Sequence, residues 1–435
     1  MKDPKKRSRR EFLKGSSATV AGAALAGGLT VTRSAHAAGS DVIKVALIGA
    51  GGRGTGAVAQ QMKADKNVKL IAIADAFENR ALGSLNNLKK QFPDQVDVPT
   101  DHVFFGLNAY KDAVATDCSL VTMATPPGFR PMQYAAAIEA GKHVFMEKPC
   151  CVDAPGFKQL MAASTMADEK NLLVGVGLQR RHQPNYMDTV KRIHDGAIGD
   201  VMFTRVYWNG GGIWNRGRSE DMTEMQYQVH NWYHFCWLSG DNIGEQHVHN
   251  LDIGNWVKDD HPVEANGMGG CTARYLGGNK GTGQIFDHHF VEFTYADGAR
   301  MYSQCRHMRG CQGNVSEAAH GTKGTSNCSG RIEGENEWRF DGRGVSGHQQ
   351  EQTDLVAALR AGKRYNEGFY GATSSFTAVL GRVANYSGKV VKWDDLVAKG
   401  TSQMPDDLAW NAPAPVQKNA EGDYPIPVPG QFNPF

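Results

Sequence analysis

The sequence has little that would build a metal site or a disulfide scaffold. Its eight cysteines are spread over 435 residues, none forms Cys-x-x-Cys, and no Cys/His spacing matches a zinc knuckle. His247 and His249 would point apart on a helix, and His288 and His289 would face opposite sides of a strand. We therefore expect mostly buried thiols and no metal.

The sequence also lacks a strong net charge and a long apolar run. The formal net charge is +2, but residues 1–37 carry +6, which leaves −4 for the rest. A mildly acidic body gives no electrostatic reason to expect nucleic acid as a partner. The apolar stretch at residues 18–31 is shorter than the roughly 20 residues that span a bilayer. We therefore expect no membrane span in the mature protein.

The first residues indicate a targeting signal. Residues 8–14, Ser-Arg-Arg-Glu-Phe-Leu-Lys, have the twin-arginine pattern, and the apolar stretch and Ala35-His36-Ala37 follow. A disordered basic tail is the alternative, but such tails rarely combine these features. We expect export to the periplasm with cleavage after Ala37. Because this pathway carries folded proteins, most of which take up a cofactor in the cytoplasm, the signal also predicts a cofactor.

The length of the chain predicts two or three domains. Six short apolar runs alternate with helix-compatible stretches, at residues 42–48, 68–75, 103–105, 119–124, 143–146 and 171–177. This alternation predicts an α/β fold with a doubly wound parallel sheet, a Rossmann domain at residues 41–178. Longer alternating strands then predict a second α/β domain at residues 179–400, with a large open, mostly antiparallel sheet. Residues 401–435 are rich in proline and predict an irregular C-terminal arm.

A glycine motif follows the first predicted strand. Gly49 permits a tight turn, Gly51 lets the backbone approach a pyrophosphate, and Gly54 allows close packing of the next helix. The N-terminus of that helix offers free N–H groups to phosphate. Asp75 ends the second strand, where it can accept hydrogen bonds from both ribose hydroxyls and repel a 2′-phosphate. The pattern predicts NAD, while Arg80 keeps NADP open as the alternative.

Five segments together resemble the Gfo/Idh/MocA family, the relatives of glucose–fructose oxidoreductase and inositol dehydrogenase. They are residues 49–54, Thr125-Pro126, 141–149 with Glu147-Lys148-Pro149, 176–181 and 244–252. The resemblance implies NAD-dependent chemistry at a sugar or cyclitol hydroxyl, and a homo-oligomer. It places Lys148 beside nicotinamide and substrate, and Glu245 and His249 at the positions of the family's Asp-x-x-x-His motif. Glutamate in place of that aspartate, and Pro127 where the family often has Asn, leave the substrate open.

The motif and the resemblance together define the expected cofactor contacts. They are Gly49, Gly51, Gly52, Arg53, Gly54, Asp75, Thr125, Pro126, Glu147 and Lys148. For the sugar pocket, the candidates are Arg180, Arg181, Trp232 and His288, although core packing explains Trp232 equally well.

The expected catalytic residues are Lys148, His249 and Glu245. A helix over residues 244–258 would place Glu245 and His249 one turn apart on one face. His249 would take the hydroxyl proton as the base, and Lys148 would stabilise the developing alkoxide. Glu245 would either hold the imidazole in the needed tautomer or bind a substrate hydroxyl.

Two enzymatic functions fit this set of residues. The first is an exported NAD-dependent oxidoreductase acting on a carbohydrate or cyclitol, with tightly bound and internally recycled NAD. The alternative is a redox-neutral glycosidase or lyase that oxidises a ring hydroxyl, eliminates the leaving group and returns the hydride; such enzymes are similar to this family. A scaffold protein with a vestigial Rossmann domain is a third possibility, but the intact Asp75, Lys148 and His249 argue against it.

Overall fold

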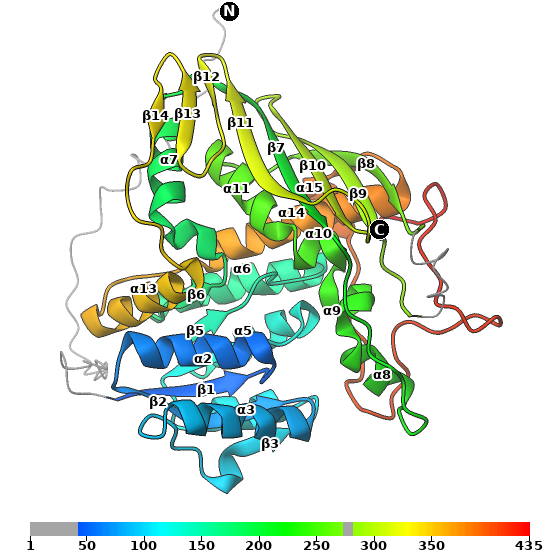
Figure 1. Cartoon of the computed structure of the whole chain (residues 1–435). Coiled ribbons are helices and arrows are strands. Elements are labelled where there is room, and N and C mark those ends of the chain that lie inside the picture. Colours follow the sequence, from blue (N-terminus) through cyan, green and yellow to red (C-terminus); the bar gives the residue numbers. More distant parts are fainter. Residues whose placement is uncertain (1–41, 273–281) are drawn as a thin grey trace, which may run out of the picture. The chain divides into compact units, whose positions relative to one another are not determined.

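The structure, a computed structural model, describes residues 42–272 and 282–435. The predicted export signal, residues 1–37, lies outside them. The described residues belong to one compact unit that is built around two sheets (Figure 1). Within these two ranges, no helix has both the length and the apolar character needed to cross a bilayer.

The first sheet is parallel and six-stranded, in the order β3-β2-β1-β4-β5-β6. Its strands are β1 (Ile43–Ile48), β2 (Val68–Asp75), β3 (Val103–Phe105), β4 (Leu120–Met123), β5 (His143–Met146) and β6 (Val174–Val176). Their apolar runs are buried because helices cover both faces. The predicted Rossmann sheet is confirmed, with a sixth strand shorter than expected.

Helices from two distant parts of the chain cover this sheet. The local ones are α2 (Gly52–Ala64), α3 (Glu78–Gln91), α4 (Ala109–Ala115), α5 (Arg130–Glu139) and α6 (Ala154–Glu169). The distant one, α13 (Gly347–Ala361), packs against α2 (Figure 1). Its Leu355, Val356 and Leu359 join the apolar core beneath β1 and β2. The helical layer on the first sheet therefore includes a helix that lies more than 150 residues beyond the last strand of that sheet.

The second sheet is nine-stranded, in the order β14-β13-β12-β11-β7-β10-β9-β8-β15. Its strands are β7 (Val201–Gly210), β8 (Glu264–Gly270), β9 (His288–Thr294), β10 (Arg300–His307), β11 (Asn314–Gly321), β12 (Gly324–Ser326), β13 (Arg331–Gly334), β14 (Trp338–Arg339) and β15 (Val391–Lys392). Only the pairing of β7 with β10 is parallel among the strand pairs of this sheet in the described ranges. The mostly antiparallel sheet is confirmed. Sequence patterns missed the strands from β11 to β15.

Two helices, α11 (Val248–Lys258) and α14 (Gly368–Ser387), cover one face of the second sheet (Figure 1). The other helices are α7 (Pro184–His194), α8 (Glu224–His230), α9 (Cys236–Ser239), α10 (Asp241–Glu245) and α15 (Trp393–Lys399), with the 3-10 turns η1 (Thr100–His102), η2 (Pro127–Phe129), η3 (Gln179–His182) and η4 (Trp232–His234). Residues 401–435, the C-terminal arm, contain neither helix nor strand.

The predicted continuous helix over residues 244–258 is wrong. Helix α10 ends at Glu245 and α11 begins at Val248. In an uninterrupted helix, the Glu245 carbonyl would accept a hydrogen bond from the His249 N–H. Here the Lys148 Nζ donates to this carbonyl, and the His247 N–H bonds to the Asn242 carbonyl. A tertiary contact thus occupies the carbonyl on which helix continuity would depend.

Candidate active site and cofactor site

The three motif glycines lie between β1 and α2 in different surroundings. Gly49 has a φ of +91°, and a Cβ there would lie 2.5 Å from the Thr125 backbone nitrogen. A Cβ on Gly54 would lie 2.0 Å from the Gly49 carbonyl oxygen. These contacts confirm the turn and the close packing. A Cβ on Gly51 would meet no atom within 4 Å, so this backbone is open to a ligand, and a pyrophosphate fits the predicted approach.

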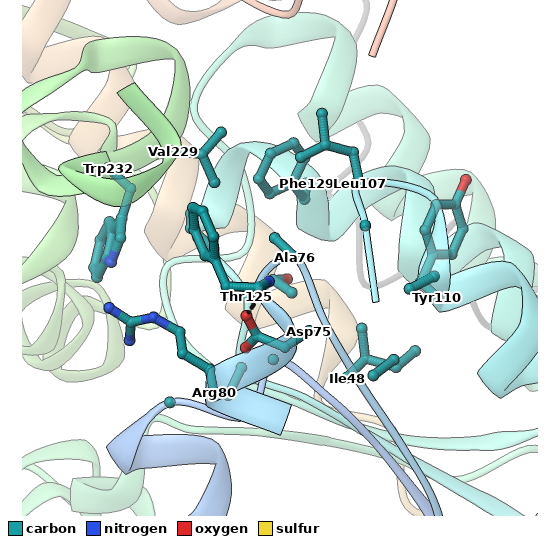
Figure 2. A pocket seen from close by; sticks show the side chains of 18 of the residues that line it. Ile48, Asp75, Ala76, Arg80, Leu107, Tyr110, Thr125, Phe129, Val229 and Trp232 are labelled. Atoms are coloured by element: carbon teal, nitrogen blue, oxygen red, sulfur yellow. Dashed lines mark hydrogen bonds between the residues drawn. The ribbon is translucent and has the colours of Figure 1, made fainter. Parts of the chain in front are cut away.

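Asp75 ends β2 and lies in the wall of a pocket beside this loop (Figure 2). Its Oδ1 accepts a hydrogen bond from the Phe77 N–H at 2.9 Å, and its Oδ2 accepts one from the Ala50 N–H at 2.7 Å. Burial raises the pKa of Asp75, and the two backbone donors oppose this shift. Each carboxylate oxygen can accept a further hydrogen bond, so both ribose hydroxyls can still bind.

Both parts of the chain contribute walls to this pocket. The predicted cofactor residues in the lining are Gly49, Gly51, Asp75, Thr125 and Pro126, and other parts of the Rossmann domain add Phe77, Arg80, Leu107, Tyr110 and Phe129. The later segment contributes Arg216, Val229 and Trp232. Figure 2 shows Val229 and Trp232 facing Asp75 and Arg80 across the pocket. The structure thus places Trp232, expected in the sugar pocket, beside the cofactor residues.

Lys148 follows β5 and contacts the second part of the chain. Its Nζ donates to the Glu245 carbonyl oxygen and lies 3.4 Å from Glu245 Oε1. The side chains are only 11% and 12% exposed. Burial raises the pKa of Glu245, and the Lys148 and Arg130 cations oppose that shift. Two of the three predicted catalytic residues therefore meet directly.

His249 lies in the first turn of α11 and is 6% exposed. Its ring stacks on Trp208 of β7, with centroids 5.9 Å apart. Burial, reinforced by the Lys148 and Arg180 cations, holds the pKa of His249 well below its usual value. The imidazole is therefore neutral at neutral pH. Its buried Nδ1 has no hydrogen-bond partner among residues 42–272 and 282–435.

Arg53 and Glu147, both expected to contact the cofactor, bind each other. Arg53 Nε donates to Glu147 Oε1, and Arg53 Nη2 lies 2.6 Å from Glu351 Oε1 on α13. Burial raises the pKa of Glu351 to about 7. Arg53 thus joins the glycine loop, the end of β5 and α13. Sequence reasoning missed Glu351, because no local pattern connects α13 with the first sheet. Direct contacts of Arg53 and Glu147 with NAD stay predictions.

Two of the predicted sugar-pocket residues have carboxylate partners within the chain. Arg181 binds Asp252 through both Nε and Nη2 at 2.8–3.1 Å and stacks 4.0 Å from the Tyr370 ring centroid. Arg180 forms an ion pair with Glu317. These contacts position both guanidinium groups at the covered face of the second sheet. Their sugar contacts stay predictions.

His288 lies on the other face of the second sheet. On β10, Cys305 is in register with Trp208, which carries the stacked His249, whereas His288 is in register with Arg306. Because side chains alternate along a strand, His288 faces away from His249. The structure does not bring His288 to this site. Within the two described ranges, no group of three or more His, Cys, Asp or Glu side chains is arranged to hold a metal ion.

Comparisons with known proteins agree with the Rossmann fold and the glycine loop described above. Residues 43–178 match the family described as an oxidoreductase family with an NAD-binding Rossmann fold (GFO_IDH_MocA). The chain is 26% identical to inositol 2-dehydrogenase 4 of Saccharopolyspora erythraea, over 46% of this chain and 55% of that protein. It is 29% identical to a scyllo-inositol 2-dehydrogenase (NADP(+)) of Bacillus subtilis, over 39% of this chain and 42% of that protein. The chain thus spans about half the length of the curated relatives it matches.

The likeness in three dimensions extends over both sheets. A crystal structure of scyllo-inositol dehydrogenase from Lactobacillus casei, with bound cofactor NAD(H) and scyllo-inositol, superimposes with a TM-score of 0.61 at 18% identity. The match covers 82% of this chain and 100% of that one, which shows a shared fold. The family match rests on the segment that contains the glycine loop, Asp75 and Lys148. Residues 43–178 therefore match the NAD-binding Rossmann domain of the Gfo/Idh/MocA oxidoreductases.

Proposed function

We propose that the protein oxidises or reduces a hydroxyl-bearing carbon of a carbohydrate or cyclitol with NAD. The observation that carries this proposal is the contact of Lys148 with Glu245 near the neutral His249, on a chain whose first domain binds NAD. The inositol dehydrogenases among the relatives support a polyhydroxylated substrate. Bound NAD supplies the hydride acceptor, and the chain supplies the proton chemistry and the positioning.

The protein groups divide the proton chemistry between them. Hydride leaves a carbinol carbon only as its hydroxyl proton is removed, and the neutral His249 ring is the proposed acceptor of that proton. The Lys148 ammonium holds the reacting oxygen and stabilises negative charge that develops on it. Glu245 keeps this ammonium in place through its carbonyl and its carboxylate. The contact favours a role for Glu245 in positioning Lys148 over one in orienting His249.

We further propose that the protein is exported and retains its NAD. The twin-arginine pattern at residues 8–14 supports export of the folded protein. No soluble NAD pool is expected outside the cytoplasmic membrane, so a freely dissociating coenzyme would be lost after one turnover. The hydride then returns within each cycle, either to a second sugar or to the same molecule. The second route is that of a redox-neutral glycosidase.

The test starts from the purified protein without added coenzyme. Denaturation should release stoichiometric NAD(H), and a panel of free sugars, cyclitols and glycosides, analysed by mass spectrometry, should identify the substrate. Turnover without accumulation of free NADH supports the closed cycle. An apo protein that needs added NAD and steadily releases NADH contradicts it and leaves an ordinary dehydrogenase. His249→Ala is the matched control, because it should retain NAD and lose turnover.

A further inference from the structure

The pocket around Asp75 has an outer wall that does not belong to the Rossmann domain. This wall consists of Arg216, Val229 and Trp232, from the segment around α8 and η4. It faces the end of β2, where the ribose and adenine of a dinucleotide bind in this type of fold (Figure 2). Nothing in the glycine motif accounts for these residues.

The side chains of this wall suit an adenosine phosphate. Arg216 stacks on Trp214, 3.8 Å from the ring centroid, and its Nη1 donates to the His230 carbonyl at 2.5 Å. Burial and the nearby Arg80 lower the pKa of Arg216 to about 10. Across the described ranges, neither Arg216 nor Arg80 forms an ion pair with an acidic residue. Guanidinium and indole faces stack on purine rings, and an unpaired guanidinium attracts phosphate.

The C-terminal arm holds this wall against the Rossmann domain. Trp410 of the arm lies against Phe77, two residues beyond Asp75, with ring centroids 5.4 Å apart. His230, at the end of α8, meets the same Phe77 ring edge-on at 5.8 Å. Phe77 is a pocket residue, so the arm reaches the pocket wall directly.

Hydrogen bonds fasten the arm to α8. Thr223 Oγ1, which caps α8, donates to the Trp410 carbonyl at 2.6 Å. Gln228 Nε2 donates to the Val416 carbonyl at 2.5 Å, and its Oε1 accepts from Trp237 Nε1 at 2.8 Å. Figure 1 shows the arm running along α8 and α9. Opening the wall therefore requires these bonds to break or the arm to move with α8.

One apolar cluster joins the Rossmann domain, α8 and the C-terminal arm. Leu107 and Phe129 come from the Rossmann loops, Met225 and Val229 from α8, and Val416 from the arm. All five side chains are less than a tenth exposed. Separating the wall from the Rossmann domain would expose this apolar surface to water, which is unfavourable.

We propose that Arg216 and Trp232 are cofactor-binding residues for the adenosine half of NAD, and that the arm holds them over it. The proposal rests on the NAD site proposed above. It gives Trp232 a cofactor contact in place of the expected sugar contact. Because the arm contact at Phe77 has to break before the wall can open, the bound dinucleotide leaves slowly. Slow release is the property that an exported, internally recycled coenzyme requires.

The first test measures how fast NADH leaves the purified protein, by stopped-flow fluorescence with excess NAD as the competitor. Trp410→Ala should raise the release rate about tenfold or more, the size expected for the loss of a packed aromatic contact. Phe432→Ala is the matched control, because Phe432 belongs to the same arm but packs on Tyr386, 5.6 Å away between centroids. It should release NADH at the wild-type rate. Equal rates in all three proteins would overturn the role of the arm.

The second test measures affinity for NAD and for ADP-ribose, which lacks nicotinamide. Trp232→Ala should weaken both by the same factor, about tenfold. Unchanged ADP-ribose affinity would refute the adenosine contact, and circular dichroism of each variant verifies its fold. Failure of the proposed function would give a different result, because the wild-type protein would then bind neither NAD nor ADP-ribose. Wild-type binding of both, with no effect of either variant, overturns only the present inference.

Discussion

Replacing single glycines of the cofactor loop by alanine should separate folding from cofactor binding. Gly51→Ala places a methyl group where no protein atom lies within 4 Å. Its backbone, with φ of −70° and ψ of −179°, is one that alanine adopts without strain. Gly54→Ala places the same methyl group 2.0 Å from the Gly49 carbonyl oxygen, a backbone atom that cannot rotate away. One substitution thus intrudes on the ligand space and the other on the protein.

The structure gives different magnitudes for the two variants. Gly54→Ala should lower the free energy of unfolding by about 3 kcal/mol, the upper end of typical overpacking costs, because α2 has to shift from β1. Gly51→Ala should change it by less than about 1 kcal/mol, since the loss of a glycine N-cap is offset by lower entropy of the unfolded chain. Its methyl group should nevertheless weaken NAD binding by roughly 10- to 100-fold, or about 1.4–2.8 kcal/mol.

Urea unfolding and NAD titration on the same preparations check both values. Gly83→Ala is the control, because Gly83 lies exposed within α3 and its Cβ would also meet nothing within 4 Å. That variant should bind NAD normally and unfold like the wild type or slightly later. If Gly51→Ala binds NAD as tightly as Gly83→Ala does, the pyrophosphate does not approach this backbone. If Gly54→Ala is as stable as the control, the packing argument fails.

Three further variants probe cofactor choice, catalysis and stability. Asp75→Ser should shift the NAD to NADP affinity ratio toward NADP by about 1–3 kcal/mol, the scale of charged hydrogen bonds, in parallel titrations; tighter binding of NADP by the unmodified protein would contradict the assignment. His249→Ala should lower turnover by about 10²- to 10⁴-fold with NAD affinity retained, and near-normal activity would show that the base is another group. Although burial opposes it, hydrogen bonds to Asp354 and Glu367 raise the pKa of His182 to about 10. The stabilisation of the folded state by charged His182 is complete below the unfolded pKa of about 6.5 and is lost as the pH rises toward 10. In urea unfolding, His182→Gln should therefore flatten the decline in the free energy of unfolding between about pH 7 and 9.5. A decline as steep as that of the wild type would refute the charged histidine.

Local sequence patterns predicted the first sheet well because its structure is set by neighbours in sequence. Strand β2 begins and ends at the predicted residues, Val68 and Asp75. The glycine roles followed from the same logic, since a tight turn and a close helix–strand approach depend on backbone only a few residues apart. For this reason the cofactor class could be predicted from the sequence.

The positions of residues that depend on distant parts of the chain could not be predicted from the sequence. Glu351 reaches Arg53 because α13 packs on α2, almost 300 residues away. Trp232 lines the pocket beside Asp75 from η4, which follows α8, and α8 in turn is hydrogen-bonded to the distant C-terminal arm. The expected helix through Glu245 failed because its carbonyl accepts a bond from Lys148. Of the neighbours His288 and His289, the register with β10 alone decides which one faces the helices. In each case a tertiary contact that no local pattern encodes decides where the residue lies.

The ion pair between Lys148 and Glu245 shows why the site needs both parts of the chain. Both side chains are nearly nine-tenths buried, and taking two charges out of water costs about as much as their attraction returns. The pair is therefore a poor source of stability, and its value lies in fixing the ammonium. Fixed in this way, the Lys148 cation helps burial to keep His249 neutral. A neutral histidine beside a positioned ammonium is the protonation state that removal of a hydroxyl proton requires. The domain contact that places Lys148 thus also contributes to the charge state of His249, the proposed base.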